Sequence, residues 1–174
     1  MNQFDEPSEF KELLRAGEKI KIEAKEGLSS PLFIRVGEKI LGTFSFDPLM
    51  QRGEYRDAGG SVLIIRDAGR AKTVALKDED ELVGSYEKRG GNIYIFTRDS
   101  NILYLNKDGF WSRAVSLVEY ETGCRFLRFT PGEESGILSI DLEVSPVFID
   151  SEDLSGLLAL VLFHLIADEI RARR

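Results

Sequence analysis

Several residue types that carry chemistry are scarce in this chain of 174 residues. It contains one cysteine, Cys124, and one histidine, His164. A single cysteine cannot form an internal disulfide, and the lack of a disulfide framework is typical of a reducing compartment. The first residues, MNQFDEPSEF, lack the basic and apolar regions of a secretory signal peptide. These features predict a cytoplasmic protein that is at most peripheral to a membrane.

The chain also has fewer basic than acidic residues. It contains 23 Lys and Arg and 30 Asp and Glu, which gives a net charge of −7. Binding to nucleic acid needs a basic face, so this balance argues against a general nucleic-acid role. Binding to anionic lipid is only made less favourable, since a local patch can be basic on an acidic protein. With 43% hydrophobic and 30% charged residues, the composition predicts one folded globular domain.

One long hydrophobic run stands out, LSGLLALVLFHLIADEI at residues 154–170. Its uninterrupted part, residues 157–167, is apolar except for His164, and Asp168 ends it. A membrane-spanning helix needs about 20 apolar residues, so a span is not expected. A helix lying on a membrane needs a charged face along its whole length, which this run lacks. A helix that is apolar all round is buried all round.

The ends of this run have the signals of helix termini. Asp150 or Ser151 can cap the free N–H groups of the first turn, which is acidic. Arg171, Arg173 and Arg174 complement the helix dipole at the other end. We therefore predict a buried helix over residues 152–172.

The rest of the chain reads as short strands after one short helix. Ser8 as N-cap and Gly17 just beyond the end predict a helix over residues 9–16. Eleven runs rich in β-branched and aromatic residues follow at intervals typical of an all-β sandwich or barrel. The runs are residues 19–25, 31–36, 39–46, 61–65, 71–76, 82–87, 92–97, 102–105, 110–120, 125–129 and 137–144.

Short turns between these runs favour antiparallel hairpins, and no interval holds a helix long enough for a parallel crossover. In a β chain, the simplest way to surround one apolar helix is with a closed sheet. The expected fold is thus mainly β: a closed antiparallel barrel around a buried C-terminal helix, with a short N-terminal helix. Residues 1–18 form the expected N-terminal segment, and residues 19–174 the barrel domain.

The run DLSGLLALVLFHLIADEI, residues 153–170, resembles the core helix of LURP-one-related domains, in which an acidic cap precedes an aliphatic run. With the strand count, it makes residues 19–174 similar to the tubby-like superfamily. That superfamily includes tubby C-terminal domains, phospholipid scramblases and bacterial tubby-like proteins of unknown function. The resemblance implies a barrel of about 12 strands. A pleckstrin-homology-like barrel also ends in a helix, but it has fewer strands and a helix with one wet face.

The resemblance also implies a binding role, because tubby domains bind phosphoinositide headgroups through surface Lys and Arg. The candidates here flank two turns that could lie at the same end of the barrel, where paired cations suit a phosphate. Ordinary solubilising charge is the alternative, since Asp67 and Glu87 are interspersed. The candidates are Arg66, Arg70, Lys72, Lys88 and Arg89.

Other chemical candidates have simpler explanations. His164 is expected to be a packed residue rather than a general base, and Cys124 a small buried hydrophobe rather than half of a Cys–His dyad. The acidic run at residues 78–81 lacks the pattern of an EF-hand loop and predicts a solvated hairpin turn. Phe110 and Trp111 are expected in the core, although they could rim a ligand mouth. No metal or cofactor is predicted.

Three classes of function stay open. The first is a non-enzymatic tubby-like module that binds an anionic lipid headgroup, a membrane or a protein partner. The second is a small ligand-binding barrel, which the filled centre disfavours. The third is an enzyme with a site that no sequence motif reveals.

Overall fold

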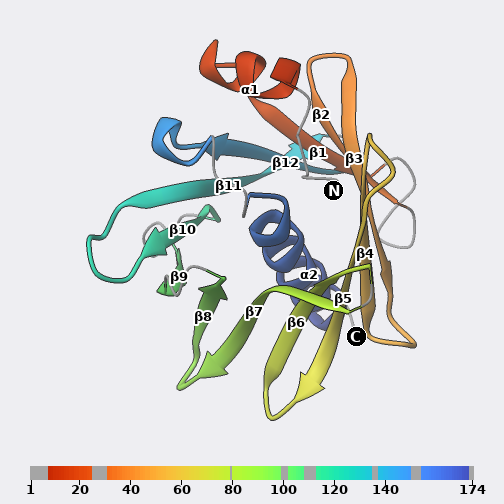
Figure 1. The fold of residues 1–174 in the computed structure, drawn as a ribbon, viewed down its shortest axis with the longest axis vertical. Coiled ribbons are helices and arrows are strands. Elements are labelled where there is room, and N and C mark those ends of the chain that lie inside the picture. Colours follow the sequence, from red (N-terminus) through yellow and green to blue (C-terminus); the bar gives the residue numbers. More distant parts are fainter. Residues whose placement is uncertain are drawn as a thin grey trace.

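A computed structural model describes residues 8–24, 31–78, 80–98, 102–107, 113–134, 137–149 and 154–172. These residues form twelve strands, two α-helices and one short 3-10 helix (Figure 1). In chain order the elements are α1 (Ser8–Arg15), β1 (Ile20–Ala24), β2 (Leu32–Val36), β3 (Lys39–Asp47), β4 (Arg52–Asp57), β5 (Val62–Gly69), β6 (Lys72–Lys77), β7 (Glu81–Arg89), β8 (Asn92–Thr97), β9 (Ile102–Lys107), β10 (Val115–Glu119), β11 (Arg125–Glu134), β12 (Ile137–Val144), η1 (Pro146–Phe148) and α2 (Leu154–Ala172).

The strands form one closed barrel in which every described strand pairs with its neighbours in the chain. All of these pairings are antiparallel, and β12 closes the barrel by pairing with β1, where Ile20 faces Leu142. The fold predicted from the sequence, a closed antiparallel barrel of about 12 strands, is confirmed. The simple up-and-down strand order had not followed from the sequence pattern.

One strand was missed, and another is shorter than expected. Strand β4 escaped because its sequence, RGEYRD, buries only Gly53 and Tyr55, so there is no run of apolar residues to detect. Strand β10 begins at Val115, whereas the sequence predicted a strand over residues 110–120. Residues 108–112 lie outside the described part of the chain. The hydrophobic pattern of the sequence therefore identifies strands with several large inward-facing side chains and misses β4, which has few.

Helix α1 ends as the sequence predicts. Gly17 has a φ of +82°, a left-handed conformation that favours glycine. The N–H of Gly17 donates to the carbonyl of Leu14 at 3.0 Å, and that of Glu18 to the carbonyl of Leu13 at 3.1 Å. These two bonds satisfy carbonyls of the last turn as a Schellman motif does. Leu14 belongs to the same cluster of buried residues as the barrel interior.

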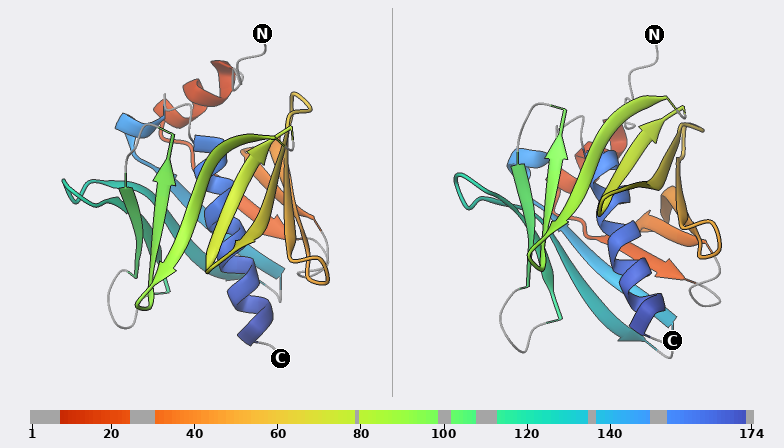
Figure 2. Two further views of the ribbon diagram at one scale, coloured as in Figure 1. Left: turned by 60° about the horizontal axis from the view of Figure 1, so that its bottom comes forward. Right: turned by 90° about the horizontal axis from the view of Figure 1, so that it is seen from below.

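Helix α2 runs through the barrel, and strands surround it in both views of Figure 2. All residues from 154 to 163 are buried, and Leu160, Val161 and Leu162 have no exposed surface. The prediction of a helix buried on all sides is confirmed for this stretch, and the helix ends at residue 172 as expected. The predicted cap, Asp150 or Ser151, the first-turn residues 152–153 and the side chains of residues 169–174 lie outside the described part of the chain. No described helix is long and apolar enough to cross a membrane.

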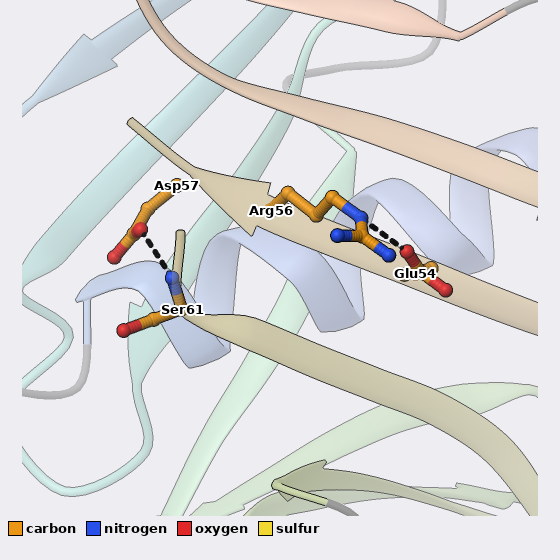
Figure 3. A network of polar contacts seen from close by, with 4 residues as sticks. All are labelled: Glu54, Arg56, Asp57 and Ser61. Carbon is orange, nitrogen blue, oxygen red and sulfur yellow. Dashed lines mark hydrogen bonds and ion pairs between the residues drawn. The ribbon is translucent and has the colours of Figure 1, made fainter. Parts of the chain in front are cut away.

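The turn between β4 and β5 shows how polar contacts fix a hairpin (Figure 3). Asp57 Oδ1 accepts the N–H of Ser61 at 2.8 Å, so the carboxylate closes the turn. On the outer face of β4, Arg56 Nε donates to Glu54 Oε1 at 2.5 Å.

Gly42 offers a test of the close approach of β3 to β4. A Cβ atom there would lie 2.6 Å from the carbonyl oxygen of Arg56 and 3.1 Å from the ring of Tyr55. Because the obstructing oxygen is backbone, Gly42→Ala should force the two strands apart and lower the free energy of unfolding by about 1–3 kcal/mol. Urea unfolding measures this. Gly59→Ala is the control, since its Cβ would meet Asp57 Oδ1 at 3.4 Å, an ordinary contact; equal urea midpoints for the two variants would contradict the prediction.

Candidate binding site at the C-terminal rim of the barrel

The two ends of the barrel differ because α2 begins near one and ends at the other. We call the end where α2 finishes the C-terminal rim; it includes the turns at residues 48–51, 70–71 and 90–91. In Figure 1 these turns lie on the lower side, around the C-terminal end of α2. The opposite end, the N-terminal rim, carries α1, the end of β6 with the start of β7, and the turn at residues 120–124.

The basic residues that the sequence singled out all lie at the C-terminal rim. Lys72, at the start of β6, faces Glu87 near the end of β7. The N–H of Lys88 donates to the carbonyl of Ala71 at 3.1 Å, which ties β7 to the β5–β6 turn. The structure thus places the two predicted turns side by side.

These basic side chains do not all point the same way. Tyr86 faces the barrel interior, where its ring packs near Phe163 of α2. Lys88, two residues further along β7, lies on the same side of the strand, and its Nζ is 3.7 Å from Asp168 Oδ1. Lys72 shares the outer face with its partner Glu87. Lys88 therefore belongs to the mouth around α2, and Lys72 to the outer wall.

Arg89 is already engaged by its neighbours. Its Nη2 is 2.6 Å from Glu87 Oε2, so the pair is close to neutral. The guanidinium also lies over the ring of Phe96, 5.7 Å from the ring centre, a cation–π arrangement. An anion at this position has to compete with Glu87. Arg89 is therefore the weakest of the predicted binding residues.

Arg66 and Arg70 are the most available of the predicted cations. Both are exposed, and among the described residues neither makes an ion pair. Arg66 faces Arg52 across the β4–β5 pairing, so two guanidinium groups emerge from neighbouring strands. Arg70 sits at the tip of the β5–β6 turn with a φ of +53°. These three arginines make a basic edge at the C-terminal rim.

Sequence reasoning missed two residues beside this edge, Leu49 and Met50. They form the tip of the β3–β4 turn and are 90% and 72% exposed. Adjacent large apolar residues between Pro48 and Gly53 were a visible signal, because turns are usually polar. Arg52 was missed with them, since β4 was not recognised as a strand.

His164 is packed as the sequence predicts. Its side chain is only 13% exposed, and Nε2 lies 3.4 Å from Asp168 Oδ2, one helical turn away. The imidazole meets the ring of Tyr86 edge to face at 5.8 Å. This setting explains how one histidine fits into an otherwise apolar helix: it lies where α2 reaches the rim.

Cys124 is exposed, which corrects the expectation of a small buried hydrophobe. It follows Gly123, whose φ is +71°, in the β10–β11 turn, and a turn at the rim leaves the side chain in solvent. A Cys–His dyad is excluded, because Cys124 lies at the N-terminal rim and His164 near the other end of the barrel.

Of the acidic run at residues 78–81, the structure describes Asp78, Asp80 and Glu81, which lie where β6 is followed by β7 at the N-terminal rim. Asp78 has a φ of +51°, and Glu81 forms an ion pair with Arg98 Nη2 at 2.5 Å. The described part of the chain contains no group of three His, Cys, Asp or Glu residues that could hold a metal ion. The expectation for Phe110 and Trp111 concerns residues outside the description.

Comparisons with known proteins relate this chain to others through its fold. No protein-family model matches the sequence, and no curated protein does. A protein from Arabidopsis thaliana, known from an X-ray structure, is similar with a TM-score of 0.55 and 14% sequence identity. The match covers 88% of this chain and 92% of that one. At this level of identity the likeness shows the fold alone, so membership of the tubby-like superfamily stays a prediction.

Proposed function

We propose that this protein is a non-enzymatic binding module of the tubby-like kind, whose C-terminal rim binds the headgroup of an anionic phospholipid. The observation that carries the proposal is the basic edge, where Arg66 and Arg70 are exposed and make no ion pair within the described chain. Arginine guanidinium groups bind phosphate oxygens in a planar, bidentate way. Arg52, opposite Arg66, brings a further cation to the same place.

The filled barrel supports a site on the outside of the molecule. Phe163 of α2 lies against Phe46 at 5.3 Å between ring centres, and Leu160 is fully buried. These side chains occupy the space that a ligand inside the barrel would need. The rim, in contrast, presents charged groups on turns held by a rigid scaffold, the usual place for a binding site.

Because the protein is acidic overall, a site for an anionic lipid must attract phosphate locally. At a net charge of −7 the molecule as a whole is repelled by an anionic surface. Screening limits this repulsion to about 8 Å at physiological salt, so a local basic edge can still act at contact distance. Each Arg near an anionic membrane surface contributes about 1 kcal/mol.

Charge reversal at the basic edge tests the proposal. We expect Arg66→Glu with Arg70→Glu to weaken flotation with phosphatidylcholine vesicles that contain a phosphatidylinositol phosphate by about tenfold or more, since two attractive charges become repulsive. The free energy of unfolding should stay within about 0.5 kcal/mol, because both side chains are exposed.

The matched control is Lys19→Glu with Arg125→Glu at the N-terminal rim, which lowers the net charge by the same amount. This variant should bind the vesicles as the wild type does. Equal loss in both variants would mean that general charge, not the basic edge, governs binding. Failure of the wild type to float with any anionic vesicle would also overturn the proposal.

A further inference from the structure

The β3–β4 turn presents apolar surface at the C-terminal rim. Leu49 is 90% exposed and Met50 72%, the former the most exposed large hydrophobic residue in the described chain. Single exposed apolar residues are common on protein surfaces. Two adjacent ones at the tip of a turn, next to a basic edge, are a pattern that needs an explanation.

The turn is held in one conformation by its own polar groups. Asp47 Oδ1 accepts the N–H of Leu49 at 2.9 Å and that of Met50 at 3.1 Å. Gln51 Nε2 donates to the carbonyl of Pro48 at 2.7 Å, and Gln51 has a φ of +50°. A turn that is already ordered loses little conformational entropy when it binds. The two apolar side chains are therefore displayed ready for contact.

The basic edge begins immediately behind this tip. Arg52 opens β4 one residue after the turn and pairs across the strands with Asp47 on β3 and Arg66 on β5. Arg70 occupies the tip of the neighbouring β5–β6 turn, which is at the same end of the barrel (Figure 1). Going from the tip along β4, the apolar side chains of Leu49 and Met50 come first, and the guanidinium group of Arg52, with Arg66 opposite it, comes second.

This order matches the layers of a membrane surface. Apolar side chains partition into the boundary between headgroups and acyl chains, while cations are held at the phosphate level. A soluble phosphate compound offers partners for the arginines but none for Leu49 and Met50. The charge and the apolar tip thus favour one occupant, a lipid bilayer.

We infer that the β3–β4 turn is a membrane-inserting tip: Leu49 and Met50 enter the interfacial layer of an anionic bilayer while Arg52, Arg66 and Arg70 contact lipid phosphates. This inference rests on the proposed headgroup binding and adds that the partner is the membrane itself. It also sets the orientation of the protein, with the C-terminal rim toward the bilayer and α1 away from it.

An environment-sensitive fluorophore at the tip tests the insertion. The full chain with Met50→Cys and Cys124→Ser is labelled at residue 50 with a nitrobenzoxadiazole dye. The matched reference is the wild type labelled at Cys124, which is exposed at the opposite rim. With vesicles of phosphatidylcholine and a phosphatidylinositol phosphate, the dye at residue 50 should shift to shorter wavelength, and the dye at Cys124 should not. Equal spectra at both positions would overturn the inference.

A second variant tests the contribution of the apolar side chains to affinity. Leu49→Ser with Met50→Ser should weaken binding to the same vesicles by about tenfold, because the tip loses the apolar area that enters the bilayer. Binding of the soluble inositol phosphate headgroup, measured by calorimetry, should be unchanged. Wild-type affinity for vesicles in this variant would show that the tip does not insert.

The outcomes separate the two proposals. If Leu49→Ser/Met50→Ser binds vesicles like the wild type while Arg66→Glu/Arg70→Glu loses vesicle binding, the inserting tip is contradicted and headgroup binding is supported. If Leu49→Ser/Met50→Ser loses vesicle binding while the charge-reversal variant binds normally, headgroup binding is contradicted and the tip is supported as a membrane contact. A wild type that binds no vesicle overturns both.

Discussion

Leu160→Asp is expected to prevent the chain from folding. Leu160 lies in the middle of α2 with no exposed surface, and one of its methyl groups sits 3.3 Å from the position of a Cβ on Gly84 of β7. The substitution removes packing worth about 2–5 kcal/mol. It also buries a charge, which costs several kcal/mol more. The sum is comparable with a total stability of about 5–15 kcal/mol.

Circular dichroism and size-exclusion chromatography measure this outcome. The variant should lose the near-ultraviolet signal of packed aromatic rings and elute as an expanded or aggregated species. Leu49→Asp is the matched control, because the same change is made at a residue that is 90% exposed. It should alter the free energy of unfolding by no more than about 0.5 kcal/mol. A folded Leu160→Asp protein would show that α2 is not the core of the barrel.

The second large effect is expected where α2 presses against β4. A Cβ on Gly53 would lie 2.9 Å from Phe163 Cδ2 and 2.9 Å from Phe44 Cζ, so the backbone of β4 touches aromatic rings on the inside. Phe163→Ala should cost about 3–5 kcal/mol through the cavity it leaves. Gly53→Ala alone should cost about 1–3 kcal/mol through overpacking.

The double variant tests whether this contact is direct. With Phe163 truncated, one of the two obstructing rings is gone, so the added methyl group fills part of the cavity. Phe163→Ala with Gly53→Ala should therefore lose less stability than the two single changes together, by about 0.5–3 kcal/mol. Denaturant unfolding of all four proteins gives this coupling. Strict additivity would contradict the packing of α2 against β4.

The elements that the sequence predicted correctly are those with a strong hydrophobic signature. Apart from His164, residues 157–167 are apolar on every side, so burial was the consistent interpretation. Strand β1 shows plain alternation, in which Ile20, Ile22 and Ala24 are buried. Strand β4 has no such signature, because it approaches α2 with Gly53 and needs no large side chain there. Its absence from the prediction follows from how closely the barrel fits its helix.

The candidate site could be predicted in part. That the turns at residues 70–71 and 90–91 lie at the same end of the barrel follows from hairpin geometry, because strand directions alternate; the pairing of Lys72 with Glu87 was not predicted. The sequence does not predict which basic side chains face outward, because the strand pairings shift register between Asp67 and Gly69 and again between Ala75 and Leu76. Each bulge changes the face that later residues occupy. Whether a basic side chain can bind a ligand also depends on its ion-pair partners, such as Glu87 for Arg89, and the sequence alone does not identify these.

The closure of the barrel by β1 and β12 has a consequence for how the protein forms. Ile20 pairs with Leu142, which lies far away along the chain, and the helix that fills the interior follows every described strand in the sequence. During synthesis, the strands therefore emerge before α2, the helix that forms the core of the barrel. Long-range pairing of this kind slows folding, and hairpins that emerge first keep their apolar faces without cover until α2 arrives. Chaperone protection during synthesis should matter more for this chain than its size suggests.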